Sequence, residues 1–231
     1  MTPEALDHLR NVDPVLRRII DIVGPCPLKP QKHRTPFESL VRAVAHQQLN
    51  GTAAESILGR FLKNFPGKRF PTPRDVAKVS DDVVRACGFS RAKIAAIRDI
   101  SAKTSSGLVP TSSKISRLTD AEIIERLIQC RGVGRWTVEM LLMFKLGRPD
   151  VLPVDDFGIR EGYKLAFQLS EQPRPKELQA LGEKWSPFRT TAAWYLWRAV
   201  DLSKEGRLHP PSIDSSVPLK TVKRGKAKKA P

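Results

Sequence analysis

Two features of the chain point to chemistry on a nucleic acid: a glycine turn and, about twenty residues later, a pair of acids. The turn is Gly132-Val133-Gly134, and the acids are Asp155 and Asp156. Backbone amides at a glycine turn that opens a helix can hold a phosphate group. A fixed carboxylate can stabilise positive charge that develops during a reaction. The pairing suggests an enzyme that acts on a nucleotide within a polynucleotide.

The glycine turn is predicted to anchor a phosphate without sequence preference. Its two glycines can adopt positive φ angles and let another chain approach the backbone closely. Arg131 and Arg135 flank the turn and would add attraction for phosphate. Contacts to phosphate position a protein on nucleic acid and do not read its sequence. Gly-x-Gly also occurs in ordinary turns between helices, so the pattern alone leaves a purely structural role open.

The acid pair stands at the start of a predicted helix, where one carboxylate can serve as the N-cap. Two neighbouring acids allow the other to face a cleft. A carboxylate near a helix N-terminus is favoured as the anion, which suits electrostatic stabilisation of a cation better than proton donation. Capping alone would also explain an Asp at this place, so the pair by itself does not establish catalysis.

The segment 47–50, Gln-Gln-Leu-Asn, is a candidate plug for the gap left when a nucleotide is extruded from a duplex. An enzyme that acts on a base must first flip it out of the stack. The helix expected to begin near Gly51 and Thr52 could offer backbone amides to a second phosphate. The alternative is an ordinary turn between helices with Leu49 as a core anchor.

Helices are expected to position all of these groups. Asp13-Pro14 and Thr35-Pro36 are N-caps followed by proline, and Thr119 with Glu122 has the pattern of a capping box. Apolar residues recur at helical spacing, and no convincing strand alternation is present. We therefore expect an all-α fold of about ten helices. They cover approximately residues 14–23, 36–46, 53–62, 81–87, 91–100, 120–128, 135–144, 157–169, 175–183 and 192–200.

The charge of the chain favours a polyanionic partner. Lys and Arg number 40 against 24 Asp and Glu, which gives a net charge of +16. The segment 213–231 holds six basic residues and one acid, so the rest of the chain keeps +11. We expect this segment to be a disordered basic tail. A basic but otherwise ordinary soluble protein is the alternative.

The sequence predicts neither a membrane protein nor a disulfide-bonded secreted one. No stretch is long and apolar enough to span a membrane, and the N-terminus has no apolar leader. Cys26, Cys87 and Cys130 match neither a disulfide framework nor zinc-ligand spacing. We expect reduced thiols, no membrane partner, a monomer, and a cytoplasmic location in association with the nucleoid.

Five segments occur in the order HQQLNGTAA, FSRAKIAAI, LIQCRGVGRWTVEMLLMF, LPVDDFGIR and WSPFRTTAAWYLWRA. Together they resemble the helix-hairpin-helix (HhH-GPD) DNA glycosylases, and in particular the DNA-3-methyladenine glycosylase II type. The resemblance implies a two-lobed helical domain over residues 1–212 with the active-site cleft between the lobes. Lobe A would comprise 1–34 and about 157–212, and lobe B about 35–156. The chain is expected to be a compact form without the N-terminal β domain of longer relatives.

The resemblance also implies roles for individual residues. Asp156 matches the family's catalytic acid, which leaves Asp155 as the helix cap and the fallback. Trp136 and Trp197 match positions that border the base pocket, where aromatic rings attract an electron-poor alkylated base. The residues expected to contact DNA, with Gln48 or Leu49 filling the gap, are Gln48, Leu49, Asn50, Gly51, Thr52, Arg131, Gly132, Val133, Gly134, Arg135 and Thr137.

Cofactor needs implied by the resemblance are small. A structural Na⁺ or K⁺ is expected at the hairpin, on the backbone carbonyl oxygens of Gln129, Arg131 and Val133. No other cofactor is expected. The chain lacks the four-cysteine cluster of the iron–sulfur members of the family.

The residue before Thr137 separates two kinds of glycosylase. Bifunctional relatives carry a lysine there, whose amine forms a Schiff base with the sugar. This chain has Trp136 instead. The resemblance therefore implies a monofunctional enzyme of base excision repair that excises alkylated purines from double-stranded DNA and has no AP lyase activity. A noncatalytic DNA-binding protein and a glycosylase for oxidised or deaminated bases are the alternatives.

Overall fold

The computed structural model describes residues 2–49 and 51–208. Asn50 and the predicted tail at 213–231 lie outside the described residues. The described residues form helices and no strand, which confirms the all-α fold. The helices are α1 (Pro3–Val12), α2 (Pro14–Val23), α3 (Pro36–His46), α4 (Gly51–Leu62), α5 (Pro73–Lys78), α6 (Asp81–Ala86), α7 (Arg91–Ser105), α8 (Ser112–Ile115), α9 (Asp120–Leu127), α10 (Arg135–Leu141), the π-helical η1 (Leu142–Leu146), α11 (Phe157–Ala166), α12 (Pro175–Leu181), the 3-10 turn η2 (Glu183–Trp185) and α13 (Arg189–Lys204).

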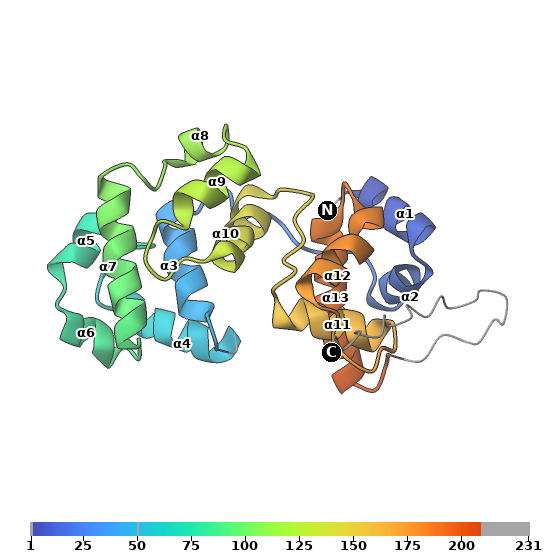
Figure 1. Ribbon diagram of the computed structural model, residues 1–231. Coiled ribbons are helices and arrows are strands. Elements are labelled where there is room, and N and C mark those ends of the chain that lie inside the picture. Colours follow the sequence, from blue (N-terminus) through green and yellow to red (C-terminus); the bar gives the residue numbers. More distant parts are fainter. Residues whose placement is uncertain (1, 50, 209–231) are drawn as a thin grey trace, which may run out of the picture.

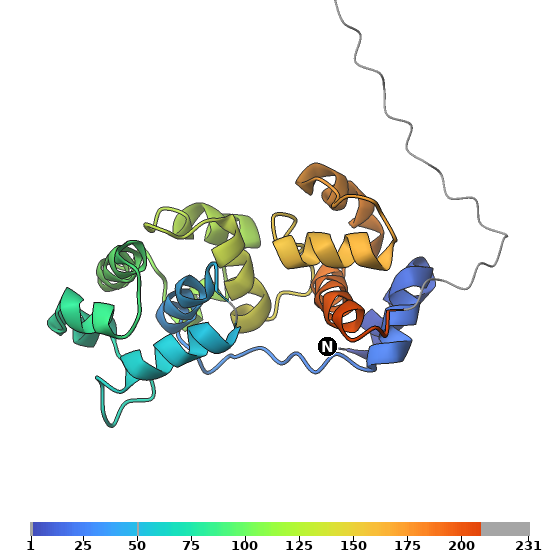
Figure 2. The ribbon, with the colours of Figure 1, turned by 90° about the horizontal axis from the view of Figure 1, so that it is seen from below.

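The helices form two lobes (Figure 1). Lobe B contains α3 to α10, and lobe A contains α1 and α2 together with α11, α12 and α13. Two stretches, 24–35 and 147–156, run between the lobes, and Figure 2 shows the same separation from another side. No helix in the described part of the chain is long and apolar enough to cross a membrane.

Side-chain caps explain where many of the helices begin. Asp13 accepts the N–H groups of Val15 and Leu16 at the start of α2. Thr119 and Glu122 form a complete capping box at the start of α9, as the sequence pattern predicts. Helices α1, α5 and α8 were not expected. The last two have only six and four residues, too few to show a helical period.

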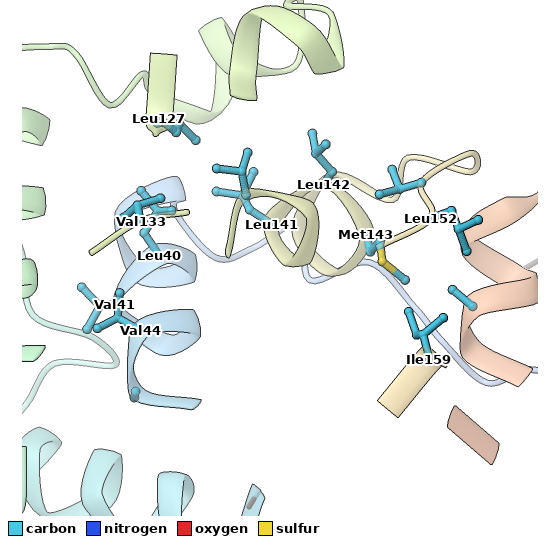
Figure 3. Packing of buried hydrophobic residues seen from close by; sticks show 14 of the residues in the cluster. Leu40, Val41, Val44, Leu127, Val133, Leu141, Leu142, Met143, Leu152 and Ile159 are labelled. Atoms are coloured by element: carbon cyan, nitrogen blue, oxygen red, sulfur yellow. The ribbon is translucent and has the colours of Figure 1, made fainter. Parts of the chain in front are cut away.

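Helix α3 forms the centre of lobe B. It packs against α4, α7 and α10, and Leu40, Val41 and Val44 on it are fully buried. This burial places the C-terminal end of α3, and the turn after it, beside the start of α10. Figure 3 shows the buried cluster continuing toward lobe A through Leu141, Leu142, Met143, Leu152 and Ile159.

The two stretches between the lobes are attached to each other. The backbone N–H of Gln31 donates to the carbonyl of Phe144 at 2.7 Å. Gly147 ends η1 with a φ of +70°, and a Cβ at this position would lie 2.4 Å from Cγ of Pro30. The glycine therefore permits both the left-handed turn and the close approach of the first stretch.

Lobe A is built on the crossing of α11 and α13. Gly162 on α11 lies so near α13 that an added Cβ would be 1.9 Å from the carbonyl oxygen of Leu196. Only a glycine allows the two backbones to come this close. The crossing brings the first turn of α11 against Trp197, which is one residue beyond Leu196 on α13.

Candidate active site

Asp156 is the N-cap of α11. Its Oδ1 accepts the backbone N–H of Ile159 at 2.8 Å. The predicted division of roles, with Asp155 as the cap, is wrong: Asp155 is exposed and lies one residue before the cap. Two adjacent acids satisfy the same sequence pattern, and only the backbone decides which of them begins the helix. One carboxylate therefore caps α11 and faces the space between the lobes.

Two tryptophans donate to the carboxylate of Asp156. Nε1 of Trp136 on α10 lies 2.7 Å from Oδ2. Nε1 of Trp197 on α13 lies 2.9 Å from Oδ1, which Ile159 also contacts. Sequence reasoning placed both indoles at the base pocket and missed that their N–H groups bind the acid. Three donors to one carboxylate fix its orientation.

A glycine makes room for this arrangement. A Cβ at Gly158 would lie 2.9 Å from Cδ1 of Trp197 and 3.1 Å from Oδ1 of Asp156. The ring of Trp197 also stacks on Phe144, with ring centroids 5.9 Å apart and an interplanar angle of 18°. The indole is therefore held between η1 and the first turn of α11. We call Asp156, Trp136, Gly158 and Trp197 the carboxylate cradle.

An ion pair fixes the start of α13, the helix that brings Trp197 to the cradle. Arg189 donates from Nε to Oδ1 of Asp150 at 2.7 Å and from Nη2 to Oδ2 at 2.8 Å. Burial alone would raise the pKa of Asp150, but the hydrogen bonds from Arg189 and Ser186 outweigh it and lower the pKa. Asp150 and Asp156 lie on the same stretch between the lobes, so the pair links α13 to the segment that ends at the catalytic candidate.

A cavity of about 700 Å³ lies between the two lobes and reaches the carboxylate of Asp156. Its volume falls within the usual range for sites that bind small molecules or single nucleotide groups. Asp156, Trp136 and Trp197 all line it. Its other walls come from the stretch 24–35, from α3, α4 and η1, and from Leu49. Leu49 lies in the turn after α3, Gln47, Gln48 and Leu49, which we call the plug turn.

Arg42 and His46 on α3 also line the cavity, together with Glu55 on α4. Arg42 donates to Glu38 at 3.0 Å, and Nε2 of His46 lies 3.1 Å from Oε1 of Glu55 on α4. Sequence reasoning assigned none of these residues to the site. Their spacing is a signal that could have been used, because Glu38, Arg42 and His46 recur every four residues along an otherwise buried helix.

The glycine turn forms an exposed hairpin between α9 and α10. Gly132 has a φ of +71°, and a Cβ there would lie 2.9 Å from the Cβ of Ala96 on α7. Gly134 is extended with a φ of −93° and is the N-cap of α10, so the prediction of a positive φ is wrong for this glycine. The amides of Gly132 and Gly134 make no hydrogen bond within the described residues, and Arg131 and Arg135 are exposed beside them. The hairpin thus presents free donors and two cations to solvent.

A network under the hairpin bears on the expected metal ion. Asp99 accepts the backbone N–H of Arg131 at 2.6 Å and Nζ of Lys103 at 2.8 Å. The same ammonium group donates to the carbonyl oxygen of Gln129. This oxygen does not suit a monovalent cation, because two like charges would share one acceptor. Residues 2–49 and 51–208 also contain no cluster of His, Cys, Asp and Glu side chains for a metal.

The plug turn lies next to the hairpin. Gln48 is exposed with a φ of +57°, and Leu49 is 40% exposed, which excludes a core anchor. Gly51 and Thr52 are exposed at the start of α4. Thr137, predicted to contact DNA, is only 1% exposed, and its hydroxyl accepts a hydrogen bond from Gln47. Asn50 lies outside the described residues.

Comparison with known families decides the classification. The sequence profile described as "HhH-GPD superfamily base excision DNA repair protein" matches residues 41–188. This range includes the plug turn, the hairpin and Asp156. The chain belongs to the HhH-GPD superfamily. The structural neighbours of the two-lobed helical fold are glycosylases of this superfamily.

Two members of the superfamily are similar over most of their length. DNA-3-methyladenine glycosylase 1 of Schizosaccharomyces pombe is 43% identical over 85% of this chain and 86% of its own. A solved structure of the S. pombe 3-methyladenine DNA glycosylase in complex with abasic DNA has a TM-score of 0.83 and covers 87% of this chain and 98% of that one. The crystal structure of a DNA-3-methyladenine glycosidase from Bacillus halodurans, 34% identical, has a TM-score of 0.75 and covers 90% and 93%.

Proposed function

We propose that this protein is a monofunctional DNA glycosylase that excises alkylated purines from double-stranded DNA in base excision repair. The observation that carries the proposal is the carboxylate of Asp156, held by two indole N–H groups inside the cavity between the lobes. A protein that only binds DNA has no use for a fixed anion near phosphates, which it repels. The 3-methyladenine glycosylases among its relatives support the alkylpurine class.

The reaction is a hydrolysis at the sugar. The bond between C1′ and the base nitrogen breaks, and its electron pair leaves with the base. A purine alkylated on a ring nitrogen already carries positive charge, so it leaves as a neutral molecule without protonation. Positive charge develops on the sugar, and Asp156 stabilises it at a fixed distance. Water then adds to C1′ and loses a proton, which leaves an abasic site.

The aromatic lining suits such a base. Trp136, Trp197 and Phe144 line the cavity, and a cationic purine is attracted to the faces of aromatic rings. The same two tryptophans donate their ring N–H groups to Asp156, so their positions are set before any base arrives. Binding of the base and orientation of the carboxylate are thus coupled through shared side chains.

Water is the proposed nucleophile, and we propose that the enzyme has no AP lyase activity. The indole of Trp136 stands where bifunctional relatives have a reactive amine, and it has no such amine. Lys145 also lines the cavity, but it is 4% exposed and its Nζ donates to the carbonyl of Lys32 at 3.3 Å. Borohydride reduction of the reaction is expected to trap no covalent protein–DNA complex, and a trapped complex would contradict this part of the proposal.

The mode of DNA binding is proposed on the same basis. The hairpin would hold a phosphate through the free amides of Gly132 and Gly134, and Gln48 or Leu49 would fill the gap left by the extruded base. Both plug candidates are exposed. We propose that the protein acts as a monomer. A monovalent cation at the hairpin stays a proposal for the carbonyls of Arg131 and Val133, since that of Gln129 already accepts Lys103.

The direct test uses two neighbouring acids as a matched pair. A duplex with one 7-methylguanine is incubated with wild type, Asp156→Asn and Asp155→Asn under single-turnover conditions, and released base is measured. We expect Asp156→Asn to slow release by about a hundredfold to a thousandfold. Asp155→Asn removes the same charge from the adjacent exposed position and should stay within about threefold of wild type.

Each outcome separates the candidate functions. Equal loss in both variants would mean that the net charge of the loop matters rather than the carboxylate of Asp156. If wild type binds the duplex but releases no base, the protein is a noncatalytic DNA-binding protein and not an enzyme. Release of 8-oxoguanine or hypoxanthine but not of 7-methylguanine would show that the substrates are oxidised or deaminated bases.

A further inference from the structure

Gln47 joins the plug turn to the hairpin. It ends α3 and is half-buried, whereas Gln48 and Leu49 after it are exposed. Its Nε2 donates to the carbonyl of Gly132 at 2.9 Å and to Oγ1 of Thr137 at 2.9 Å. One acceptor is in the hairpin and the other is in the first turn of α10. A single amide group therefore connects two segments that are far apart in sequence.

The backbone around Gln47 is fixed from below. Nζ of Lys93 on α7 donates to the carbonyls of Ala45 and Gln47, at 2.8 Å each. Burial lowers the pKa of Lys93. Ala96, three residues further on α7, lies against Gly132. Positions three apart share one face of a helix, so one face of α7 supports both the plug turn and the hairpin.

The conformation of the next residue depends on this support. Gln48 has a φ of +57°, a left-handed conformation that a residue with a Cβ adopts only at a cost in free energy. Such conformations persist where the surrounding structure holds them. Here Gln47 is fixed on one side, and the N–H of Leu49 closes the turn on the carbonyl of His46 at 3.2 Å. The exposed side chain of Gln48 is thus directed by its neighbours.

We propose that Gln47 is a positioning residue that holds the plug turn at a set distance from the hairpin, so that a bound phosphate and an extruded nucleotide are engaged together. The proposal rests on the proposed glycosylase function. It implies that Gln47 contributes little to binding of an intact duplex, which needs the hairpin alone. Gln47 contributes much to extrusion of the nucleotide, because extrusion needs the hairpin and the plug turn at a fixed distance from each other.

The test compares variants that change the amide of Gln47 or the hydroxyl of Thr137 that accepts from it. Gln47→Met keeps the length of the side chain and removes the donor, and Gln47→Glu places a carboxylate against the carbonyl of Gly132. Thr137→Ser keeps the hydroxyl acceptor and Thr137→Val removes it. Gln179→Met, on α12 in lobe A, makes the same change as Gln47→Met away from the site. All are made in the full chain.

Besides the thermal midpoint of unfolding, three quantities are measured for each variant. They are affinity for an undamaged duplex, extrusion in a duplex with 2-aminopurine beside an abasic-site analogue, and single-turnover release of 7-methylguanine. For Gln47→Met we expect slower extrusion and release by about tenfold to a hundredfold, with undamaged-duplex affinity within about threefold and an unchanged thermal midpoint. Gln47→Glu should be slower still, Thr137→Val intermediate and slower than Thr137→Ser, and Gln179→Met like wild type.

The two proposals fail separately. If undamaged-duplex affinity and extrusion fall by the same factor in Gln47→Met, Gln47 only stabilises the fold and the inference is overturned. Unchanged extrusion in that variant would overturn it as well. If wild type releases no alkylated base, the proposed function fails, but 2-aminopurine extrusion still compares wild type with Gln47→Met and decides the role of Gln47.

Discussion

The hairpin at 131–135 and the carboxylate cradle are built in opposite ways. The hairpin offers backbone amides from consecutive residues, and its contacts with other elements come from α7 and from the side chain of Gln47. The cradle offers one side chain, and its partners come from three different helices, α10, α11 and α13. An anchor for phosphate can be local because phosphate is met at the surface. A carboxylate that acts on a sugar must be held in place by hydrogen-bond donors on several sides. These donors come from residues that are distant in the sequence.

Each of the two regions depends on a glycine for close packing. A Cβ would lie 2.9 Å from the Cβ of Ala96 at Gly132 and 2.9 Å from Cδ1 of Trp197 at Gly158. The same small substitution can therefore be made in either region. If the hairpin and the carboxylate cradle work independently, a substitution at Gly132 should affect DNA binding and one at Gly158 should affect base release.

Among the substitutions in these two regions that leave Asp156 in place, Gly158→Ala is expected to slow base release most. The added methyl group meets Trp197 and Oδ1 of Asp156, so it displaces the indole from the carboxylate. A displacement of this size costs about a hundredfold in rate. Single-turnover release measures the loss, and the affinity for an undamaged duplex should not change. A parallel loss of affinity would show that the cradle also serves as an anchor.

Gly132→Ala is expected to destabilise the hairpin by about 1–2 kcal/mol, because a left-handed residue with a Cβ is strained. The contact with Ala96 adds to this cost. Affinity for an undamaged duplex should fall, as titration of a labelled duplex would measure. The double variant with Ala96→Gly removes the contact but keeps the strained φ, so it should recover only part of the affinity. Full recovery would show that the φ at Gly132 is unimportant.

Trp197→Phe is expected to slow base release by about tenfold. The phenyl ring keeps the stacking on Phe144 but loses the donor to Oδ1 of Asp156. A hydrogen bond to a charged group contributes about 1.5–3 kcal/mol, and Ile159 still donates to the same oxygen. The rate at saturating duplex measures the effect. An unchanged rate would show that the indole serves the base and not the carboxylate.

The pH dependence of stability should reveal the ion pair that fixes α13. The Arg189 bonds depress the folded-state pKa of Asp150 below 3.8. The pair therefore stabilises the fold above pH 3.8, and this stabilisation is lost as the pH falls through the folded pKa. Asp150→Asn should lower the free energy of unfolding by about 1 kcal/mol at pH 7. Chemical unfolding measures this loss. The difference in the free energy of unfolding between variant and wild type should become smaller in acid. A difference that does not change with pH would show that the charge of Asp150 is not the cause of the stabilisation.

Helices were largely predictable from the sequence because caps and apolar spacing act within a few residues. The capping box at Thr119 and the start of α2 at Asp13 are examples. The short α5 and α8 were missed because helices of fewer than two turns show no helical period. For the adjacent Asp155 and Asp156 the sequence pattern is the same, so the helix start could not be assigned between them without the backbone angles.

The residue types at the site were visible in the sequence, but their contacts were not. The indole of Trp197 meets Asp156 because Gly162 lets α11 and α13 touch and Gly158 leaves space for the ring. The bonds from Gln47 to the hairpin depend on α7, whose Lys93 and Ala96 lie under both segments. The sequence around Gly158 and Gly162 does not show why glycine is needed there. At each position a Cβ would collide with an atom of α13, which is distant in the sequence.

The chain by itself determines an all-helical protein, a glycine hairpin with exposed amides, and an acid at a helix start, since each follows from interactions between near neighbours. Tertiary structure decides that Asp156 is both cap and cavity carboxylate, that two tryptophans bind it through their N–H groups, and that the plug turn is attached to the hairpin. These depend on how closely helices approach, and a side chain's distance from a residue far along the chain is set by packing of the whole fold.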